Sequence, residues 1–352
     1  MSSLDVVELA ASDYPQWIGM NAASPGGSIY SDPRYLEVLC AATGDHFRVI
    51  AVRRAGELLG GIAVYEMRTS HGTRASPRGL LYYHGPVLRR LETSYPSEQT
   101  AAHAKTMSAL AGAMARRGYG AIVLKSPAAI ADVRPFIDQG WSVRPSYTYV
   151  VPIADPPAQW LKVERNLRRL IKRCEERDGM VFSPDDDFEA FFALHGATLQ
   201  RKQAAGYLPK AAFAAYFERL KQLGLAQIYH ARLPDGRAVA TQLVLLGPYT
   251  TSHTVCAGGD PAFHNTGAQA FLRWKAFEHL SRLGYHANDL TDAALNSVTH
   301  FKSQFGGTLE MPLVIEARPT LRYAAGNRAA ATLDRGARLL HSLAFKLTGL
   351  PP

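Results

Sequence analysis

Cysteine is scarce in this sequence of 352 residues, which has only Cys40, Cys174 and Cys256 at widely separated positions. Their odd number and the absence of a CxxC pair argue against a disulfide framework and against a zinc site, so we expect no metal. A chain of this length can bury a large apolar core without covalent cross-links. We therefore predict three buried free thiols in a reducing, cytoplasmic compartment.

Long apolar runs are also missing, since none approaches the ~18 residues that a membrane-spanning helix needs. Residues 1–17 are neither basic nor continuously apolar, which argues against a secretory signal. The hydrophobic content of 47% and the charged content of 20% are typical of a globular protein. The formal net charge of +9 favours anionic partners, such as CoA, a nucleotide-linked sugar, tRNA or the inner face of a membrane.

Hydrophobic periodicity predicts strands and helices in alternation, and hence a mixed α/β fold. Two hairpins are indicated, one over residues 47–67 and one over residues 225–246 around the turn Pro234-Asp235-Gly236. Helices are predicted over residues 100–118, 132–139, 158–178, 187–203, 210–223, 267–283 and 298–304. Further strands are predicted over residues 80–88, 121–124, 141–153, 180–182, 249–258, 287–290 and 309–316.

Short motifs recur in the two halves at nearly the same separation. Arg117-Gly118-Tyr119 corresponds to Leu283-Gly284-Tyr285, and Phe136–Gly140 corresponds to Phe301–Gly306. Each half has the order hairpin, strand, helix, strand, short helix, strand. We predict an internal duplication, with an N-terminal unit at residues 1–152, a C-terminal unit at residues 153–318 and a helical tail at residues 319–352.

The tail is predicted to form an amphipathic helix. An apolar stripe runs along it, and basic residues lie off the stripe (Leu333, Ala337, Leu340, Ala344 and Leu347; Arg335, Arg338 and Lys346). Such a helix either packs on its own domain, as surface helices commonly do, or lies on a membrane surface.

The C-terminal unit ends in Phe301-Lys302-Ser303-Gln304-Phe305-Gly306-Gly307, where a lysine on a short helix precedes two glycines. This segment and the duplicated order of elements resemble the FemAB-related family of tandem GNAT-fold acyltransferases, as do Tyr83–Leu88, Asn166–Lys172 and Gly284–Asp289. The resemblance implies two GNAT-like units, each a mixed twisted sheet flanked by helices. It also implies N-acyl transfer from acyl-CoA or aminoacyl-tRNA to an amine of a small-molecule or nucleotide-linked acceptor, such as a cell-envelope precursor.

Acyl transfer to an amine requires a group that takes the amine proton, donors that stabilise the oxyanion, and substrates held at attack distance. Lys302 lies beside two glycines, where a carbonyl or a phosphate can approach, and it is the candidate oxyanion donor. Asp289, at the end of a predicted buried strand, is a candidate base or a group that orients the amine, unless it caps the next segment. His253, on a central strand, is either a further base or a hydrogen-bonded core histidine.

Candidate binding residues fall into two groups. The family resemblance implies that the loop after a predicted helix lines the acceptor cleft, and a polar residue on a central strand joins that group (Arg201, Lys202 and Tyr207; Gln242). The second group begins a helix, where free amides suit a pyrophosphate, although a plain helix cap has the same pattern (Asn265, Thr266, Gly267 and Ala268).

The densest positive charge lies on the predicted helix at residues 158–178. It favours either a nucleic-acid or nucleotide partner, tRNA included, or a solvated face paired with nearby glutamates. The N-terminal unit has Ile137 where the C-terminal unit has Lys302, so we predict that the chemistry lies in residues 153–318. The alternative is a non-catalytic GNAT-like module that binds an anionic ligand. The sequence indicates no oligomeric state.

Overall fold

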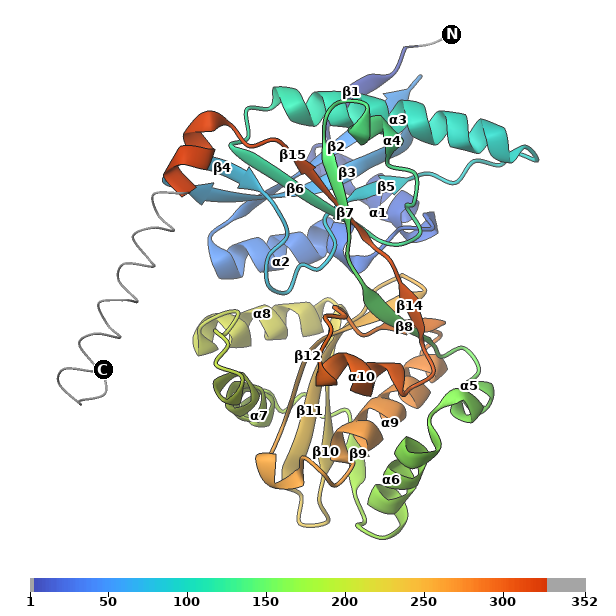
Figure 1. Ribbon diagram of the computed structural model, residues 1–352, viewed down its shortest axis with the longest axis vertical. Helices are drawn as coiled ribbons and strands as arrows, with labels where there is room; N and C mark the ends of the chain where they lie inside the picture. Colours follow the sequence, from blue (N-terminus) through green and yellow to red (C-terminus); the bar gives the residue numbers. More distant parts are fainter. Residues whose placement is uncertain (1–2, 328–352) are drawn as a thin grey trace, which may run out of the picture.

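The computed structural model describes residues 3–327 and confirms the mixed α/β fold predicted from the sequence. Two twisted sheets, one in each half of the molecule, are covered by helices (Figure 1). Within residues 3–327, no helix is both long enough and apolar enough to cross a membrane. Of the predicted tail, residues 321–327 are helical, whereas residues 328–352, which carry the apolar stripe, lie outside the described part.

The first unit contains the predicted hairpin of residues 47–67 as β2 and β3. Of the segment predicted as a strand at 80–88, only Pro86–Leu88 forms a strand, β5, which pairs with β3. The strands are β1 (Asp5–Glu8), β2 (His46–Arg54), β3 (Glu57–Thr69), β4 (Gly72–Ala75), β5 (Pro86–Leu88), β6 (Ala121–Ser126) and β7 (Ser142–Pro145). The helices are α1 (Tyr14–Ala23), α2 (Pro33–Thr43), α3 (Pro96–Arg116) and α4 (Arg134–Ile137).

The second unit contains the predicted hairpin around Asp235 as β10 and β11. Its helices are α5 (Pro156–Lys162), α6 (Arg165–Glu176), α7 (Phe188–Arg201), α8 (Lys210–Gln222), α9 (Ala268–Arg282) and α10 (Ser297–Ser303). Its strands are β8 (Thr148–Pro152), β9 (Val181–Ser183), β10 (Ala226–Arg232), β11 (Ala238–Leu245), β12 (Thr251–Gly259), β13 (Ala287–Asp289) and β14 (Thr308–Glu310). The chain then forms β15 (Leu313–Ala317).

The two sheets share one strand order, as the predicted duplication requires. The first has the order β1-β2-β3-β4-β6-β15-β7, with β5 beside β3, and the second has the order β9-β10-β11-β12-β13-β8-β14. In each sheet the fourth and fifth strands of this order are parallel, whereas the other neighbours along it are antiparallel. The parallel pairs are β4 with β6 and β12 with β13.

The units exchange one strand each. β15, from the end of the second unit, inserts between β6 and β7, and β8 lies between β13 and β14 (Figure 1). The segments predicted as single strands at 141–153 and 309–316 are therefore each divided between the two sheets. Pro145 and Pro312 lie at these divisions, where proline interrupts strand pairing. The sheets thus do not separate at the predicted boundaries of 152 and 318.

A shared core fixes the two units against each other. The rings of Tyr35 on α2 and Tyr216 on α8 meet edge-on, with their hydroxyl oxygens 3.2 Å apart. The hydroxyl of Tyr249 donates to the buried carboxylate of Asp32 across the junction at 2.9 Å. Buried hydrogen bonds of this kind hold the two units in one relative arrangement, because breaking them leaves polar groups without partners. The three cysteines are buried and unpaired, as predicted.

The predicted basic helix at 158–178 is in fact two helices, α5 and α6. The chain turns at Val163 and Glu164, where the Glu164 N–H donates to the carbonyl of Gln304 at 2.9 Å and the Gln304 amide donates to the Glu164 carboxylate at 2.8 Å. The segment after Lys302 therefore docks on the α5–α6 turn. This tertiary contact, absent from any local pattern, explains the break.

Replacing Gly306 with alanine is expected to destabilise the fold by about 2–4 kcal/mol, because two costs combine. Gly306 has φ +70°, and an added Cβ would lie 2.7 Å from the Lys162 carbonyl oxygen. Gly140, the matching glycine of the first unit, has φ +81° with nothing within 4 Å, so Gly140→Ala should cost only about 1 kcal/mol. Denaturant midpoints would measure the stability of both variants. Equal losses of stability would contradict the role of Gly306 in docking on the α5–α6 turn.

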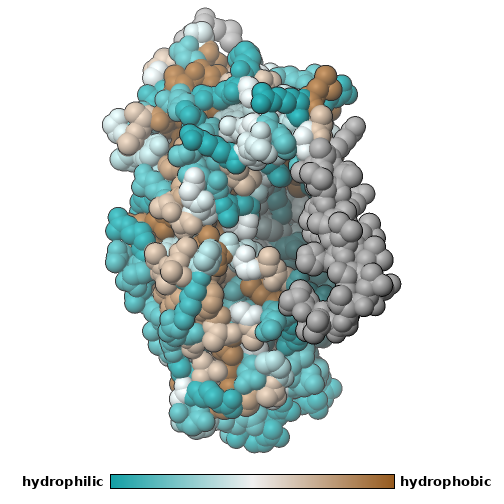
Figure 2. All heavy atoms as spheres, turned by 90° about the vertical axis from the view of Figure 1, so that its left-hand side faces the viewer, coloured by the Kyte–Doolittle hydropathy of each residue, from teal (hydrophilic) through white to brown (hydrophobic). Residues whose placement is uncertain are grey.

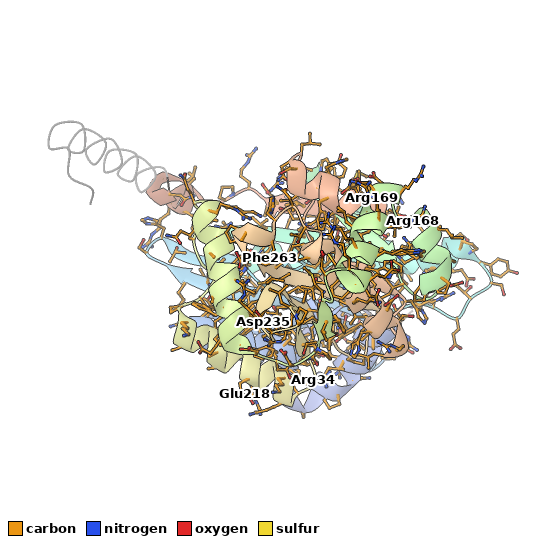
Figure 3. The ribbon with its side chains drawn as sticks, turned by 90° about the horizontal axis from the view of Figure 1, so that it is seen from below. Arg34, Arg168, Arg169, Glu218, Asp235 and Phe263 are labelled. Atoms are coloured by element: carbon orange, nitrogen blue, oxygen red, sulfur yellow. The ribbon has the colours of Figure 1, made fainter. Side chains whose placement is uncertain are left out.

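The face of the molecule on which α7 and α8 lie carries both polar and apolar side chains. Figure 2 shows hydrophilic and hydrophobic side chains interspersed over both units on this face. The basic residues of α6 lie elsewhere, since Arg168 and Arg169 are on the side of the second unit away from Glu218 of α8 in the view from below (Figure 3).

Candidate functional site

A gap opens in the second sheet where two parallel strands separate. β12 and β13 pair only over Thr251–His253 and Ala287–Asp289. β12 then continues to Gly259, and a bulge at Val255 changes its register against β11. Bulges bend a strand and are common beside functional sites. Part of β12 is therefore left without a strand neighbour on this side.

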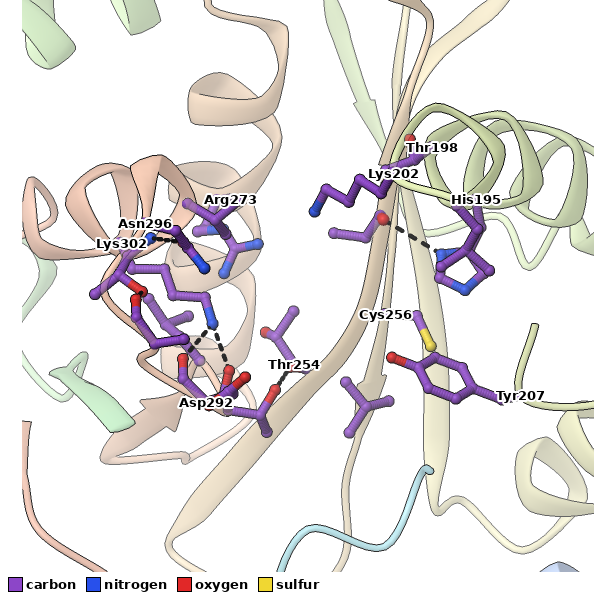
Figure 4. Close-up of a pocket in the computed structure, with 18 residues that line it drawn as sticks. His195, Thr198, Lys202, Tyr207, Thr254, Cys256, Arg273, Asp292, Asn296 and Lys302 are labelled. Atoms are coloured by element: carbon purple, nitrogen blue, oxygen red, sulfur yellow. Dashed lines mark hydrogen bonds between the residues drawn. The ribbon is translucent and has the colours of Figure 1, made fainter. Parts of the chain in front are cut away.

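A cleft of about 280 Å³ lies at this gap (Figure 4). Alternate residues of β11 pack against α7 on one face of the sheet and against α9 on the other, so both helices reach the gap. α10 and the loop after β13 complete the wall. The polar residues of the lining include His195, Lys202, Tyr207, Arg273, Asp292 and Lys302.

Two further hollows extend this cleft. One shares Tyr207 and Asp292 with it and is lined on its other side by the first unit, including Lys125. The other shares Lys202 and Arg273 and reaches the start of α9. The joined space therefore runs from the start of α9 to the junction of the units.

Lys302 lies in the cleft, as predicted. Its ammonium donates to the backbone carbonyls of Thr291 and of Asp292, the latter at 2.6 Å. An ammonium has three N–H donors, so one remains for a ligand. Burial lowers the pKa of Lys302 to about 8, and the nearby positive charge of Arg273 acts in the same direction.

The loop that accepts these bonds has a strained backbone. Thr291 has φ +43° and Asp292 has φ +62°, in the left-handed region that a β-branched threonine rarely adopts. The Asp289 carboxylate accepts the Thr291 N–H at 2.8 Å, and the Thr291 hydroxyl donates to the Thr254 carbonyl at 2.8 Å. Strain held by such bonds is typical of functional sites. It sets the two carbonyls that orient Lys302.

Asp289 and His253 do not line the cleft, contrary to the expectation from their strands. Asp289 is only 2% exposed, and its oxygens accept bonds from the hydroxyls of Tyr83 at 2.7 Å and Thr148 at 2.5 Å. Burial opposes its ionisation, but His253 at 3.4 Å and these hydroxyl donors outweigh burial and lower the pKa of Asp289. His253 is packed against Tyr30 and Tyr83. We therefore describe Asp289 as a positioning residue rather than a base.

The predicted acceptor-binding residues are only partly brought together. Arg201 and Lys202 end α7 and line the hollow toward α9. The ring of Tyr207 stacks on His195 with centroids 5.9 Å apart. Gln242 is buried on β11 in the face that packs against α9, and it does not line the cleft. Its predicted contact with substrate is therefore not supported.

At the start of α9, two of the three amides predicted to bind a pyrophosphate already have hydrogen-bond partners. The Thr266 N–H donates to a carbonyl of the preceding turn at 3.2 Å, and the Ala268 N–H donates to the Thr266 hydroxyl at 3.3 Å. Gly267, at φ +97°, lies against Leu170 of α6. Asn265 is exposed, and of the four predicted residues only Ala268 lines the joined space. The structure therefore gives little support for an acyl-CoA pyrophosphate at this helix start, which stays a prediction.

Side chains also occupy the open edge of β12. The Nδ1 of His195 is 3.3 Å from the Ala257 carbonyl oxygen, and the Gly259 N–H donates to the Thr198 hydroxyl at 3.1 Å. An extended, amide-bearing ligand would have to displace these partners to pair with this part of the strand. Part of this edge is thus already occupied by α7.

His195 is a candidate base that the sequence interpretation missed. A carbonyl can only accept, so Nδ1 carries the proton and Nε2 has a free lone pair; within the described part of the chain Nε2 has no hydrogen-bond partner. Burial lowers the pKa of His195, which keeps the ring neutral. Helical spacing gave a signal, because His195, Thr198 and Lys202 share one face of α7.

Arg273 is the second residue that the sequence interpretation missed. It lies on α9, among the apolar residues Phe271, Leu272 and Trp274. A charged residue inside such a buried helix was the available signal, because arginine is seldom buried without a partner. It projects into the cleft from the side opposite His195 (Figure 4).

Comparison with known families identifies the second unit. Residues 162–303 match the sequence model described as an acetyltransferase (GNAT) domain. The match includes three cleft residues, His195, Arg273 and Lys302. Residues 162–303, fewer than half of the chain, are therefore similar to GNAT acetyltransferase domains. A comparison with curated proteins gave no match.

Solved structures show the same fold over nearly the whole chain. FemX is 13% identical with a TM-score of 0.69, covering 88% of this chain and 96% of its own. A putative lysylphosphatidylglycerol synthetase C-terminal domain from Agrobacterium fabrum is 15% identical with a TM-score of 0.58, covering 91% and 96%. A tandem GNAT protein from the clavulanic acid pathway is 13% identical with a TM-score of 0.54, covering 90% and 100%. The expected resemblance to FemAB-related and tandem GNAT proteins is confirmed at the level of fold.

Proposed function

We propose that this chain transfers an acyl or aminoacyl group from an activated donor to an amine in the cleft between α7, α9 and α10. The observation that carries the proposal is that one cleft contains both a hydrogen-bond donor for the oxyanion and an acceptor for the amine proton. Lys302 offers a free ammonium donor, and His195 offers a neutral ring with a free lone pair. These are the two groups that amine acylation requires.

The proposed reaction is direct transfer. The amine attacks the donor carbonyl, and the C–N bond forms as the carbonyl oxygen becomes negative beside the Lys302 ammonium. His195 takes the amine proton at Nε2. The bond between the carbonyl carbon and the donor then breaks, and the leaving group keeps the electron pair and receives a proton from the imidazolium. No covalent acyl-enzyme is needed.

The donor is proposed to be aminoacyl-tRNA or an acyl thioester. The Thr266 and Ala268 amides at the start of α9 already have partners, which disfavours CoA bound by that helix. The neighbours named as FemX and as a putative lysylphosphatidylglycerol synthetase keep an aminoacyl donor in consideration. The acceptor amine is proposed to enter from the hollow at the junction of the units.

The basic side chains of that hollow suit an anionic acceptor, such as a nucleotide-linked cell-envelope precursor. Lys125 lies 3.3 Å above the centroid of the Tyr82 ring, and burial lowers the pKa of Lys125 to about 8. Arg78 lines the same space and is paired with Asp45 at 2.5 Å. Such a precursor would meet the protein at the inner face of the membrane, where we propose that it acts.

The test is a transfer screen with purified full-length protein. Acetyl-CoA, longer acyl-CoAs and aminoacyl-tRNAs would each be combined with amine acceptors, including amino sugars linked to a nucleotide, and products detected by mass spectrometry. Lys302→Ala serves as the negative control. Transfer by wild type alone supports the proposal.

A second function, ligand binding without chemistry, is favoured by two features. Part of the β12 edge is occupied by α7, and two amides at the start of α9 already have partners, so fewer backbone groups are left to hold CoA. Anion binding without transfer from any donor in the screen would establish this alternative. Absence of both transfer and binding would contradict both functions.

A further inference from the structure

Arg273 is a buried guanidinium without a counter-ion. It is 5% exposed, and neither Nε nor Nη1 has a hydrogen-bond partner within residues 3–327. The salt bridges found in the same residues do not include it. Its nearest charge-stabilising neighbour is the ring of Phe301, with the centroid 6.0 Å away. Burial lowers the pKa of Arg273 to about 10, but the group stays charged at neutral pH.

The surroundings of Arg273 increase the free-energy cost of burying its charge. Lys202 comes from α7 and Lys302 from α10, and both point into the same space as Arg273 (Figure 4). Asp292 is the one acidic residue among those that line the main hollow. Burying a charge without a partner costs free energy of folding, and neighbouring like charges add to it. Such a group lowers the stability of the fold unless a bound ligand neutralises its charge.

We propose that Arg273 and Lys202 bind a phosphate group of one substrate inside the cleft, beside the ammonium of Lys302. Three cations and one carboxylate leave a surplus of two positive charges in the main hollow. A phosphate monoester carries nearly that charge, whereas a carboxylate would leave one cation uncompensated. The planar guanidinium can also form two parallel bonds to phosphate oxygens.

This subsite differs from anion binding at a helix start. The Ala268 amide at the start of α9 donates to the Thr266 hydroxyl, and Arg273 lies further along that helix, so in this proposal side chains rather than backbone amides hold the phosphate. α7 and α9 pack on opposite faces of the sheet, so one phosphate between Lys202 and Arg273 would join them across the gap. The claim that the phosphate belongs to a substrate rests on the proposed function, but its binding does not.

Arg273→Met tests the proposal through two readouts. The variant keeps most of the side-chain length and removes the charge, so the ligand-free protein should melt about 2–5 °C higher than wild type. Inorganic phosphate should raise the melting temperature of wild type and of Arg237→Met, a matched variant at the rim whose arginine is paired with Asp260 at 3.1 Å. Arg273→Met should bind phosphate at least about tenfold more weakly by titration calorimetry.

Arg273→Lys keeps one charge but loses the guanidinium fork, so its phosphate affinity should fall by about three- to tenfold. Acetate at matched ionic strength should have little effect on wild type. Tighter binding of uridine diphosphate than of glycerol 3-phosphate would indicate a nucleotide source, and the reverse order a lipid headgroup.

Three results would overturn the proposal. The first is unchanged phosphate affinity in Arg273→Met or Arg273→Lys, and the second is an equal response of wild type to acetate. The third is a lower melting temperature or failure to fold of Arg273→Met, which would show that the arginine is structural. Phosphate binding that depends on Arg273, together with no transfer in the screen, would instead contradict only the proposed function.

Discussion

Lys302→Ala is expected to lower kcat/KM for acyl transfer by about 10²–10³-fold, the usual effect of removing one oxyanion donor. Lys302 is oriented by two loop carbonyls and has one donor left for the developing oxyanion. Rates with the donor–acceptor pair found in the screen measure the effect. Lys172→Ala, on the exposed face of α6 and outside the cleft, is the control and should retain full activity.

The same lysine predicts the alkaline side of the pH profile. Only the protonated amine donates, and the pKa of Lys302 is lowered to about 8, chiefly by burial. Activity should therefore fall as the pH rises through about 8. Arginine stays protonated, so residual activity of Lys302→Arg should not fall in this range. An unchanged rate in Lys302→Ala, or the same alkaline fall in Lys302→Arg, would show that another group acts here.

His195→Ala is expected to lower kcat by about 10²–10⁴-fold with a smaller change in KM, because a general base acts on the reaction step. The free Nε2 of His195 and the bond from Nδ1 to Ala257 suit this role. His195→Gln can keep a bond to the Ala257 carbonyl and cannot act as a base, so it separates positioning from proton transfer. His46→Ala, exposed on β2 of the first unit, is the matched control.

The acid side of the profile follows from the lowered pKa of His195. Burial disfavours the imidazolium, so the ring stays neutral, and active, to a pH below the ordinary histidine value. Wild-type activity should fall only when the pH drops below that value. An acid fall that persists in His195→Gln would assign it to a different group. Recovery of the wild-type rate by His195→Gln would reduce His195 to a positioning role.

The local sequence predicted the repeated elements because their signals are local. Turn residues at the hairpins and glycines after helices specify backbone conformations within a few residues. The alignment of Phe136–Gly140 with Phe301–Gly306 pointed to Lys302 for the same reason, and the matching strand orders of the two sheets agree with it. The difference between the two motifs showed which unit has the lysine.

Predictions that depended on the direction of a side chain were less secure. Asp289 and His253 lie on strands next to the gap, but only residues beyond the point of separation face it. His195 and Arg273 come from helices on opposite faces of the sheet, so no sequence spacing links them. The helix start at Gly267 has a pattern typical of phosphate binding, yet two of its amides already have partners and α6 lies against it.

By itself, the sequence determined two similar α/β units, three free buried cysteines, and a lysine beside two glycines in the second unit. Only the tertiary structure decided that β8 and β15 change sheets, that Gly306 is a docking contact, and that Lys302, His195 and Arg273 share a cleft. The physical reason is the distance along the chain over which each effect acts. Periodicity and turn chemistry act over a few residues, whereas the cleft depends on how far two strands separate and on what packs against both faces of their sheet.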